Sequence, residues 1–103
     1  MNLHILKGNL TVKDNKRVWT WINSTDNFSE KIRVENEPQE GDLIKLADED
    51  YYVSAVQSEI ISHHYNLPKG DKFCAVIRKL EYNKGDYVQD VKNNHTYLTQ
   101  TCY

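Results

Sequence analysis

The sequence predicts an all-β fold, a small antiparallel barrel of five to seven strands, and three observations support this prediction. Apolar and polar residues alternate with a period of two in many short stretches, which is the spacing of a half-buried strand. Turn-forming residues separate these stretches at short intervals, as in small barrels and sandwiches. No segment combines sustained helical periodicity with capping residues. With 103 residues, the chain is long enough for one domain, residues 1–103, and not comfortably for two.

The expected strands share alternating apolar residues, strand-forming side chains and bounding turn residues. They span residues 3–6, 10–12, 18–22, 31–35, 43–46, 51–56, 59–65 and 73–82. The second of these segments either continues the first strand or pairs with it. Polar turns or loops are expected at residues 13–16 and 23–30.

Glycine and proline place the main reversals of the chain. Pro38 restricts φ and Gly41 permits a positive φ, so a turn is expected to end at Asp42. Residues 67–71 repeat this chemistry, and residues 83–86 form a third Gly-Asp turn. Three similar turns between short strands favour a meander over a duplicated unit.

Two of the expected strands have distinctive patterns. Residues 73–77 form the most continuous apolar run of the chain, which predicts a central strand buried on both faces. In residues 51–56 the strict alternation fails after Val53. We therefore expect a β-bulge near Ser54 and Ala55, which would help a small barrel to curve.

The C-terminal tail, residues 87–103, has a weaker pattern than the rest of the chain. Its first part, residues 87–91, fits either a strand or a short helix. Residues 96–103 alternate weakly and fit an edge strand.

Composition and charge limit the classes of partner. The formal net charge is -2 and the sequence pI is near 6.0. General nucleic-acid binding is disfavoured, although not excluded, because phosphate contacts need basic residues. No apolar run approaches the roughly 20 residues of a membrane span. The N-terminus lacks the pattern of a signal peptide, so we expect a cytoplasmic protein without a membrane partner.

The cysteines and histidines do not predict a metal centre. Cys74 and Cys102 are expected to be free thiols, because a reducing compartment disfavours disulfides. His63 and His64 are adjacent, and neighbouring side chains of a strand point to opposite faces. No zinc-type spacing of ligands is present, so neither a metal nor another cofactor is expected.

Catalytic motifs are equally lacking in the sequence. There is no G-x-S-x-G, no P-loop and no G-x-G-x-x-G. Cys74 could in principle pair with His63 or His64. Its apolar surroundings would raise the pKa of the thiol, however, which is the wrong direction for a nucleophile. We therefore expect a protein that is not an enzyme.

Two tryptophans offer one candidate binding surface. Trp19 and Trp21 should share one face of their strand, as in the stacking platforms of proteins that bind single-stranded nucleic acids. Lys31 and Arg33 could contact the phosphates. The opposing interpretation is that the tryptophan face is the hydrophobic core. We favour the core, because large aromatic side chains compensate for few aliphatic ones.

An acidic hairpin with neighbouring tyrosines offers the other candidate surface. Tyrosine is an efficient interface residue, and carboxylates can meet a basic partner. The candidate contacts are Asp48, Glu49, Asp50, Tyr51, Tyr52, His63 and Tyr65. The alternative is that the acids are merely solvated, since the spacing of a calcium loop is absent.

One stretch resembles a known group of proteins. Pro38-x-x-Gly41-Asp42-Leu43-Ile44, followed by Tyr51-x-Val53-x-x-Val56, is similar to small SH3-like or OB-like β-barrel accessory proteins of tailed bacteriophages. The resemblance covers residues 38–80 and implies a barrel, but it transfers no catalytic residue.

These observations lead to one main hypothesis and two alternatives. The main hypothesis is a non-enzymatic phage or mobile-element protein that binds and modulates a host protein, in host takeover or anti-defence. It would act in the host cytoplasm. The alternatives are a single-stranded nucleic-acid-binding protein and a structural component of a virion.

Overall fold

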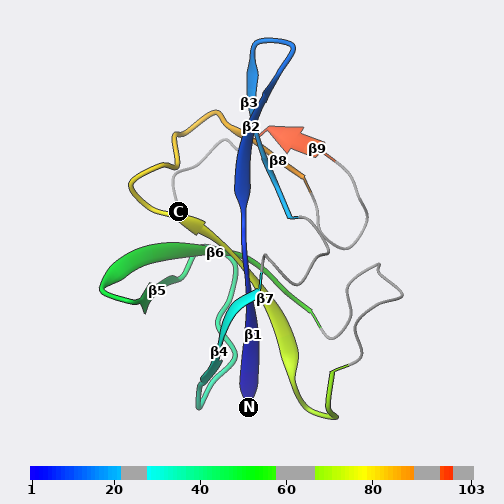
Figure 1. Ribbon diagram of the computed structural model, residues 1–103, viewed down its shortest axis with the longest axis vertical. Coiled ribbons are helices and arrows are strands. Elements are labelled where there is room, and N and C mark those ends of the chain that lie inside the picture. The colour runs from blue at the N-terminus through cyan, green and yellow to red at the C-terminus, as the bar shows by residue number, and fades with distance from the viewer. Residues whose placement is uncertain (22–27, 58–66, 90–95, 99–103) are drawn as a thin grey trace.

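The computed structural model describes residues 1–21, 28–57, 67–89 and 96–98. These residues form nine strands and contain no helix. The strands are β1 (Asn2–Lys7), β2 (Asn9–Lys13), β3 (Lys16–Thr20), β4 (Phe28–Arg33), β5 (Leu43–Leu46), β6 (Glu49–Gln57), β7 (Lys72–Arg78), β8 (Tyr87–Gln89) and β9 (Thr96–Leu98). They build a five-stranded sheet in the order β4-β1-β7-β6-β5 and a four-stranded sheet in the order β2-β3-β8-β9 (Figure 1).

The all-β class is confirmed, but the strand count and pairing differ from the prediction. There are nine short strands instead of five to seven. The sheets are mixed, because β1 pairs in parallel with β7 and β3 pairs in parallel with β8. Periodicity identifies a strand from its own residues and says nothing about its neighbours in the sheet. Parallel pairs between distant parts of the chain therefore leave no local signal.

The chain passes from one sheet to the other at Gly8. The Gly8 N–H donates to Val76 O at 2.8 Å, which holds this point against β7. An added Cβ at Gly8 would lie 3.3 Å from Trp21 Cε2 and 3.4 Å from Trp19 Cε3. Glycine thus lets the backbone pass close to two indole rings. This crossing divides one long N-terminal strand into β1 and β2.

The larger sheet is strongly curled around the main hydrophobic core, as in a half-barrel (Figure 1). The buried members of this core are Leu3, Ile5, Leu46, Tyr51, Val53, Cys74 and Val76. Ile32 of β4 and Ile44 of β5 pack against the same core, although β4 and β5 are the two edges of the sheet. A flat sheet would keep its edges apart, so the curl is needed to close this core. The arrangement is compatible with a small β-barrel.

A β-bulge in β6 contributes to the curl and confirms the sequence prediction. Val53 pairs with Val76 and Ala55 pairs with Ala75, so Ser54 is an extra residue on β6. Such a bulge bends its strand and increases the local twist.

The central strand β7 is buried on both faces, as predicted. Cys74 and Val76 belong to the main core, while Ile77 faces the opposite side and packs in a second cluster with Trp19. The strand ends at Arg78, so its predicted extension through Tyr82 is wrong. The chain turns there instead, with the N–H groups of Glu81 and Tyr82 donating to Arg78 O. This turn places Tyr82 in the second cluster, where its side chain is buried.

The three Gly-Asp turns are confirmed and share one geometry. Gly41, Gly70 and Gly85 have φ values of 93°, 92° and 94°. In each turn the N–H of the following aspartate donates to the carbonyl three residues earlier, on Gln39, Pro68 or Asn83. This is the hydrogen bond of a type II turn, whose third residue requires a positive φ.

The C-terminal tail contributes the short strand β8, which settles the choice between strand and helix for residues 87–89. β9 lies at the edge of the smaller sheet, as expected for residues 96–98. The predicted strand at 31–35 is β4, which starts and ends earlier in the chain. The predicted strand at 59–65 lies outside the described residues.

Candidate functional site

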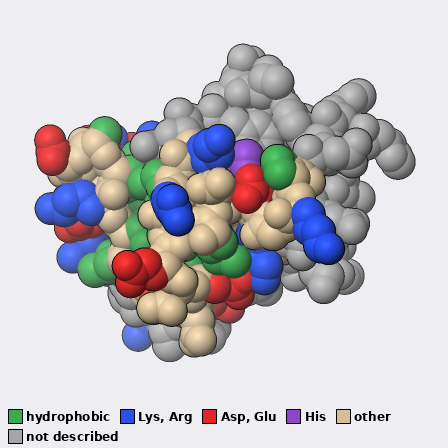
Figure 2. Space-filling model, turned by 90° about the horizontal axis from the view of Figure 1, so that it is seen from below, with side chains coloured by type: hydrophobic (Ala, Val, Ile, Leu, Met, Phe, Trp, Pro, Cys, Tyr) green, Lys and Arg blue, Asp and Glu red, His purple; other side chains and the backbone are tan. Residues whose placement is uncertain are grey.

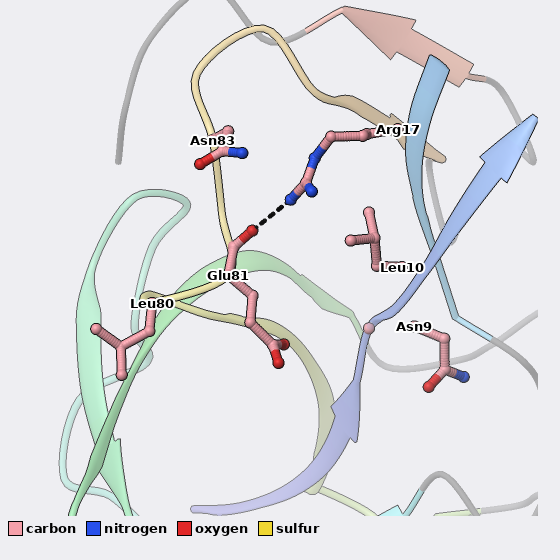
Figure 3. A pocket seen from close by; sticks show the side chains of 7 residues that line it. Asn9, Leu10, Arg17, Leu80, Glu81 and Asn83 are labelled. Atoms are coloured by element: carbon pink, nitrogen blue, oxygen red, sulfur yellow. Dashed lines mark hydrogen bonds between the residues drawn. The ribbon is translucent and has the colours of Figure 1, made fainter. Parts of the chain in front are cut away.

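An open cleft lies beside the point where the chain crosses between the sheets (Figure 3). Its volume is about 420 Å³. One wall comes from β2 and β3, and the other from the segment that follows β7. The lining residues, which define the Arg17 cleft, are Gly8, Asn9, Leu10, Arg17, Leu80, Glu81 and Asn83.

Arg17 joins the two walls. Its Nη2 donates to Glu81 O at 2.7 Å, the bond that Figure 3 shows as a dashed line. Its Nε donates to Asp86 Oδ1 at 3.0 Å. Two hydrogen bonds from one planar guanidinium restrict the rotation of the side chain. The segment after β7 is therefore fastened to β3.

Asp86 also helps to hold the segment after β7 against β3, and it does so from a buried position. Its side chain is 4% exposed, and its Oδ2 accepts hydrogen bonds from Trp19 Nε1 at 2.8 Å and from the Asn83 N–H at 3.2 Å. A buried carboxylate is tolerated when it is paired and hydrogen-bonded. Here the third Gly-Asp turn supplies the carboxylate, and the core tryptophan and Arg17 supply donors.

The rim of the cleft carries exposed aliphatic side chains. Leu80 is 83% exposed, Val12 is 72% exposed and Leu10 is 36% exposed. Leu10 and Val12 lie on one face of β2, since side chains two apart in a strand share a face. Their cross-strand partners on β3 are Trp19 and Arg17. Leu10 and Val12 therefore lie on the same face of the smaller sheet as the buried Trp19.

β2 also presents an unpaired strand edge. It pairs with β3 through a two-residue turn at Asp14 and Asn15, whose φ values are 53° and 62°. In this hairpin type the pairs alternate between hydrogen-bonded and non-bonded. Leu10 and Val12 fall in non-bonded pairs, so their N–H and C=O groups point away from β3. Within the described ranges, no strand pairs with this outer edge.

Exposed lysines lie on the elements that form the cleft. Lys13 and Lys16 are exposed on the β2–β3 hairpin, and Lys79 and Lys84 are exposed on the segment that carries Leu80 and Asn83. No ion pair joins any of these four lysines to another described residue. Lys13 and Lys16 pair with each other and alternate with Val12 and Arg17, so they lie on the face of the hairpin opposite to the cleft. On that face Lys16 Nζ lies 5.0 Å from the centroid of the Tyr87 ring, a cation–π contact.

The charge distribution is uneven along the chain. Residues 35–50 contain seven carboxylates and one lysine, in contrast to the lysines of the β2–β3 hairpin and of the segment after β7. The β2–β3 hairpin lies at one end of the long axis and the N-terminus at the other (Figure 1). Figure 2 shows the end that carries the N-terminus, where basic and acidic side chains are interspersed around small apolar areas. That end shows no area of a single sign of charge.

Only part of the acidic hairpin that was predicted as a contact surface is accessible to a partner. Asp48 and Asp50 are exposed at the β5–β6 turn. Glu49 is half-buried and its Oε1 accepts from Arg78 Nη2. Tyr51 is 5% exposed and belongs to the main core, so it is not an available contact. Alternation explains this, because Tyr51 shares the inner face of β6 with Val53.

Of the remaining predicted protein contacts, one packs against the second cluster and two lie outside the described residues. Tyr52 is half-buried and packs edge-on against Tyr82, with ring centroids 5.9 Å apart. His63 and Tyr65 lie outside the described residues.

The predicted nucleic-acid platform is not assembled in the structure. Trp19 is 1% exposed and packs with Ile77 and Val88, as the core interpretation expected. Trp21 is half-buried and packs against the second cluster and against a further cluster formed by Leu6 and Phe73. Lys31 and Arg33 are exposed on β4, which belongs to the other sheet. The two tryptophans and the two cations therefore do not form one surface.

Cys74 is buried, which agrees with its predicted place in the core. Burial raises the pKa of its thiol from 9.0 to about 12, and the nearby negative charge of Glu37 adds to this shift. Among the residues with a described position, no group of three or more His, Cys, Asp or Glu side chains could hold a metal ion. His4 Nε2 and Asp71 Oδ2 form an isolated pair at 2.9 Å.

Sequence reasoning missed the residues that build the cleft. Asp86 had a usable signal, since it ends a Gly-Asp turn beside a strand. Leu80 also had one, because it is an isolated leucine among charged residues after the apolar run. Arg17 had no signal, because its partners are distant in the sequence.

Comparison of the chain with protein-family models, curated proteins and solved structures gives no match. The resemblance of residues 38–80 to phage barrels stays a prediction. Within the described part of the chain, no helix has the length and apolar character needed to cross a membrane.

Proposed function

We propose that this protein is a non-enzymatic module that binds another protein through the Arg17 cleft. The observation that carries the proposal is the coincidence of exposed aliphatic side chains and an unpaired strand edge at one cleft. Leu80, Val12 and Leu10 are exposed there, beside the outer edge of β2. Natural proteins usually cover or charge such an edge, and a clustered apolar rim marks interaction sites.

Energetics favour a protein surface as the ligand. Complete burial of an aliphatic side chain contributes roughly 1.5–3 kcal/mol, so Leu80 and Val12 together offer a substantial gain to a partner that covers them. Binding also costs free energy when it orders mobile groups. The bonds of Arg17 to Glu81 O and Asp86 already fix the two walls, which lowers that cost.

The exposed acids at the β5–β6 turn provide a second contact surface in this proposal. Asp48 and Asp50 keep their carboxylates in water and are free to meet a basic area on the partner. Charges at the rim of an interface mainly affect the rate of association and its salt dependence. We therefore assign the affinity to the cleft and the steering to this turn.

The test is an affinity capture from bacterial lysate with tagged wild-type and variant proteins, with and without nuclease. Leu80→Asp combined with Val12→Asp should abolish capture of a stoichiometric protein. Leu43→Asp is the matched control, because Leu43 is 50% exposed on β5, away from the cleft. Equal capture by all three proteins would refute the assignment to the cleft.

The same experiment separates the other hypotheses. Asp48→Ala combined with Asp50→Ala should slow association without abolishing capture. A captured partner that disappears after nuclease treatment would indicate a nucleic acid instead of a protein. Recovery of the tagged chain alone, in a large homo-oligomer, would contradict the proposal and favour a structural component.

A further inference from the structure

We infer that the Arg17 cleft binds an extended, acidic peptide segment of the partner as an additional strand on β2. This inference rests on the proposed function and names the chemistry of the ligand. It combines three features, which are the direction of the backbone groups on β2, the apolar rim of the cleft and the exposed lysines of the β2–β3 hairpin.

The backbone supplies the first feature. The N–H and C=O groups of Leu10 and Val12 point outward from the β2–β3 hairpin, because both residues are in non-bonded pairs. An extended peptide that lies along this edge would form hydrogen bonds with both residues. Strand addition to an open sheet edge is a common mode of peptide recognition, in which the main chain contributes affinity.

The apolar rim supplies the second feature. Leu10 and Val12 lie on the face of β2 that looks towards the cleft, and Leu80 stands on the opposite wall. Alternate side chains of an added strand would fall between these walls, because side chains alternate in direction along a strand. The ligand should therefore have β-branched or apolar residues at every second position.

The lysines supply the third feature. Lys13 and Lys16 are exposed on the face of the β2–β3 hairpin opposite to Leu10 and Val12, and neither has an ion pair with another described residue. Among the described residues, Glu81 is the one carboxylate that lines the cleft, and its Oε1 lies 3.5 Å from Arg78 Nη1. The remaining alternate positions of the ligand should accordingly carry carboxylates.

The first measurement is fluorescence anisotropy of the full chain with three labelled probes. They are a peptide of alternating glutamate and valine, the same peptide with lysine in place of glutamate, and a single-stranded oligothymidylate. The glutamate peptide should bind on the order of tenfold more tightly than the lysine peptide. Equal binding of both peptides, or tighter binding of the oligothymidylate, would overturn the inference.

N-methylation of the glutamate peptide tests for strand addition itself. Alternate N–H groups of a strand point to opposite edges. Only one set of residues, either all valines or all glutamates, therefore points its N–H groups at β2. Methylation of that set should abolish binding, while methylation of the other set should largely preserve it. Binding that is unaffected by both modifications would exclude a strand on β2.

Charge reversal tests the role of the lysines. Lys13→Glu combined with Lys16→Glu should weaken binding of the glutamate peptide by about tenfold, because the glutamates of the added strand point to the face that carries these two lysines. The matched control is Lys45→Glu combined with Lys69→Glu, which reverses two exposed lysines elsewhere. An equal effect of the two double variants would show that only the net charge of the protein matters and would overturn the local role.

The experiments distinguish a failure of the strand mode from a failure of protein binding at the cleft. If the glutamate peptide does not bind but the Leu80 and Val12 variant still loses its captured partner, the strand mode is wrong and protein binding at the cleft stands. If both experiments are negative, the cleft is not a binding site.

Discussion

Replacing Asp86 by alanine should destabilise the fold more than any other single loss of a carboxylate among the described residues. Asp86 is the buried acceptor that joins Trp19, Arg17 and the Asn83 N–H. Alanine removes all three hydrogen bonds at once. The expected loss of stability can be divided among the three donors, because they differ in their access to water.

The Trp19 contribution is the largest. The indole is 1% exposed, so its Nε1–H would be left without a partner at a cost of about 1–3 kcal/mol. The Arg17 side chain is 39% exposed and can return to water, so its loss costs about 0.5–1 kcal/mol after screening. The Asn83 N–H is partly buried and adds a similar amount. Together these losses amount to about 3 kcal/mol, a large part of the stability of a small domain.

The assay is urea and thermal unfolding followed by tryptophan fluorescence. For a domain of this size, the midpoint temperature should fall by about 12–24 °C. Asp42→Ala is the matched control. Asp42 occupies the same position of a Gly-Asp turn, and its Oδ2 accepts from the Gln39 N–H at 2.9 Å, but the residue is exposed. That variant should lose about 1 kcal/mol or less.

A double-mutant cycle isolates the buried bond. In a Trp19→Phe background there is no indole donor to leave unpaired, so Asp86→Ala should cost about 1–3 kcal/mol less than in the wild type. An Asp86→Ala variant as stable as Asp42→Ala, or a cycle without coupling, would refute the reasoning.

The remaining predictions concern two glycines and the buried thiol. Gly70→Ala should cost about 1–2 kcal/mol by urea unfolding, from backbone strain at φ +92° in otherwise open space. Gly8→Ala should cost about 1–3 kcal/mol and change tryptophan emission, because its Cβ would press on the Trp21 ring; unchanged emission would contradict this contact. Cys74, measured in a Cys102→Ser variant, should react with a maleimide at pH 8 only after unfolding. Its raised pKa also implies stability that is complete below pH 9.0 and is lost as the pH rises towards about 12, which urea titrations at several pH values would detect.

Sequence reasoning succeeded where the signal is local. The bulge at Ser54 and the burial of residues 73–77 on both faces follow from the order of apolar residues along one strand. The three Gly-Asp turns follow from the conformational freedom of glycine at positive φ. The burial of Trp19 was anticipated because a chain with few aliphatic residues needs its aromatic side chains in the core.

Sequence reasoning failed where the outcome depends on neighbours. Tyr51 was selected as a contact, but the register of β6 turns it into the core. The strand that was expected to continue through Tyr82 instead ends at Arg78, because the second cluster needs Tyr82 beside Trp19.

By itself, then, the sequence determined the all-β class, the turns, the bulge and the central strand, since each depends on residues adjacent in the chain. Tertiary structure alone decided the mixed pairing of the sheets, the curl that closes the main core and the Arg17 cleft. Arg17 and Trp19 meet Asp86 across 69 and 67 positions of the chain. No pattern of adjacent residues encodes such contacts, because they arise only when β3 and β8 pair within the smaller sheet.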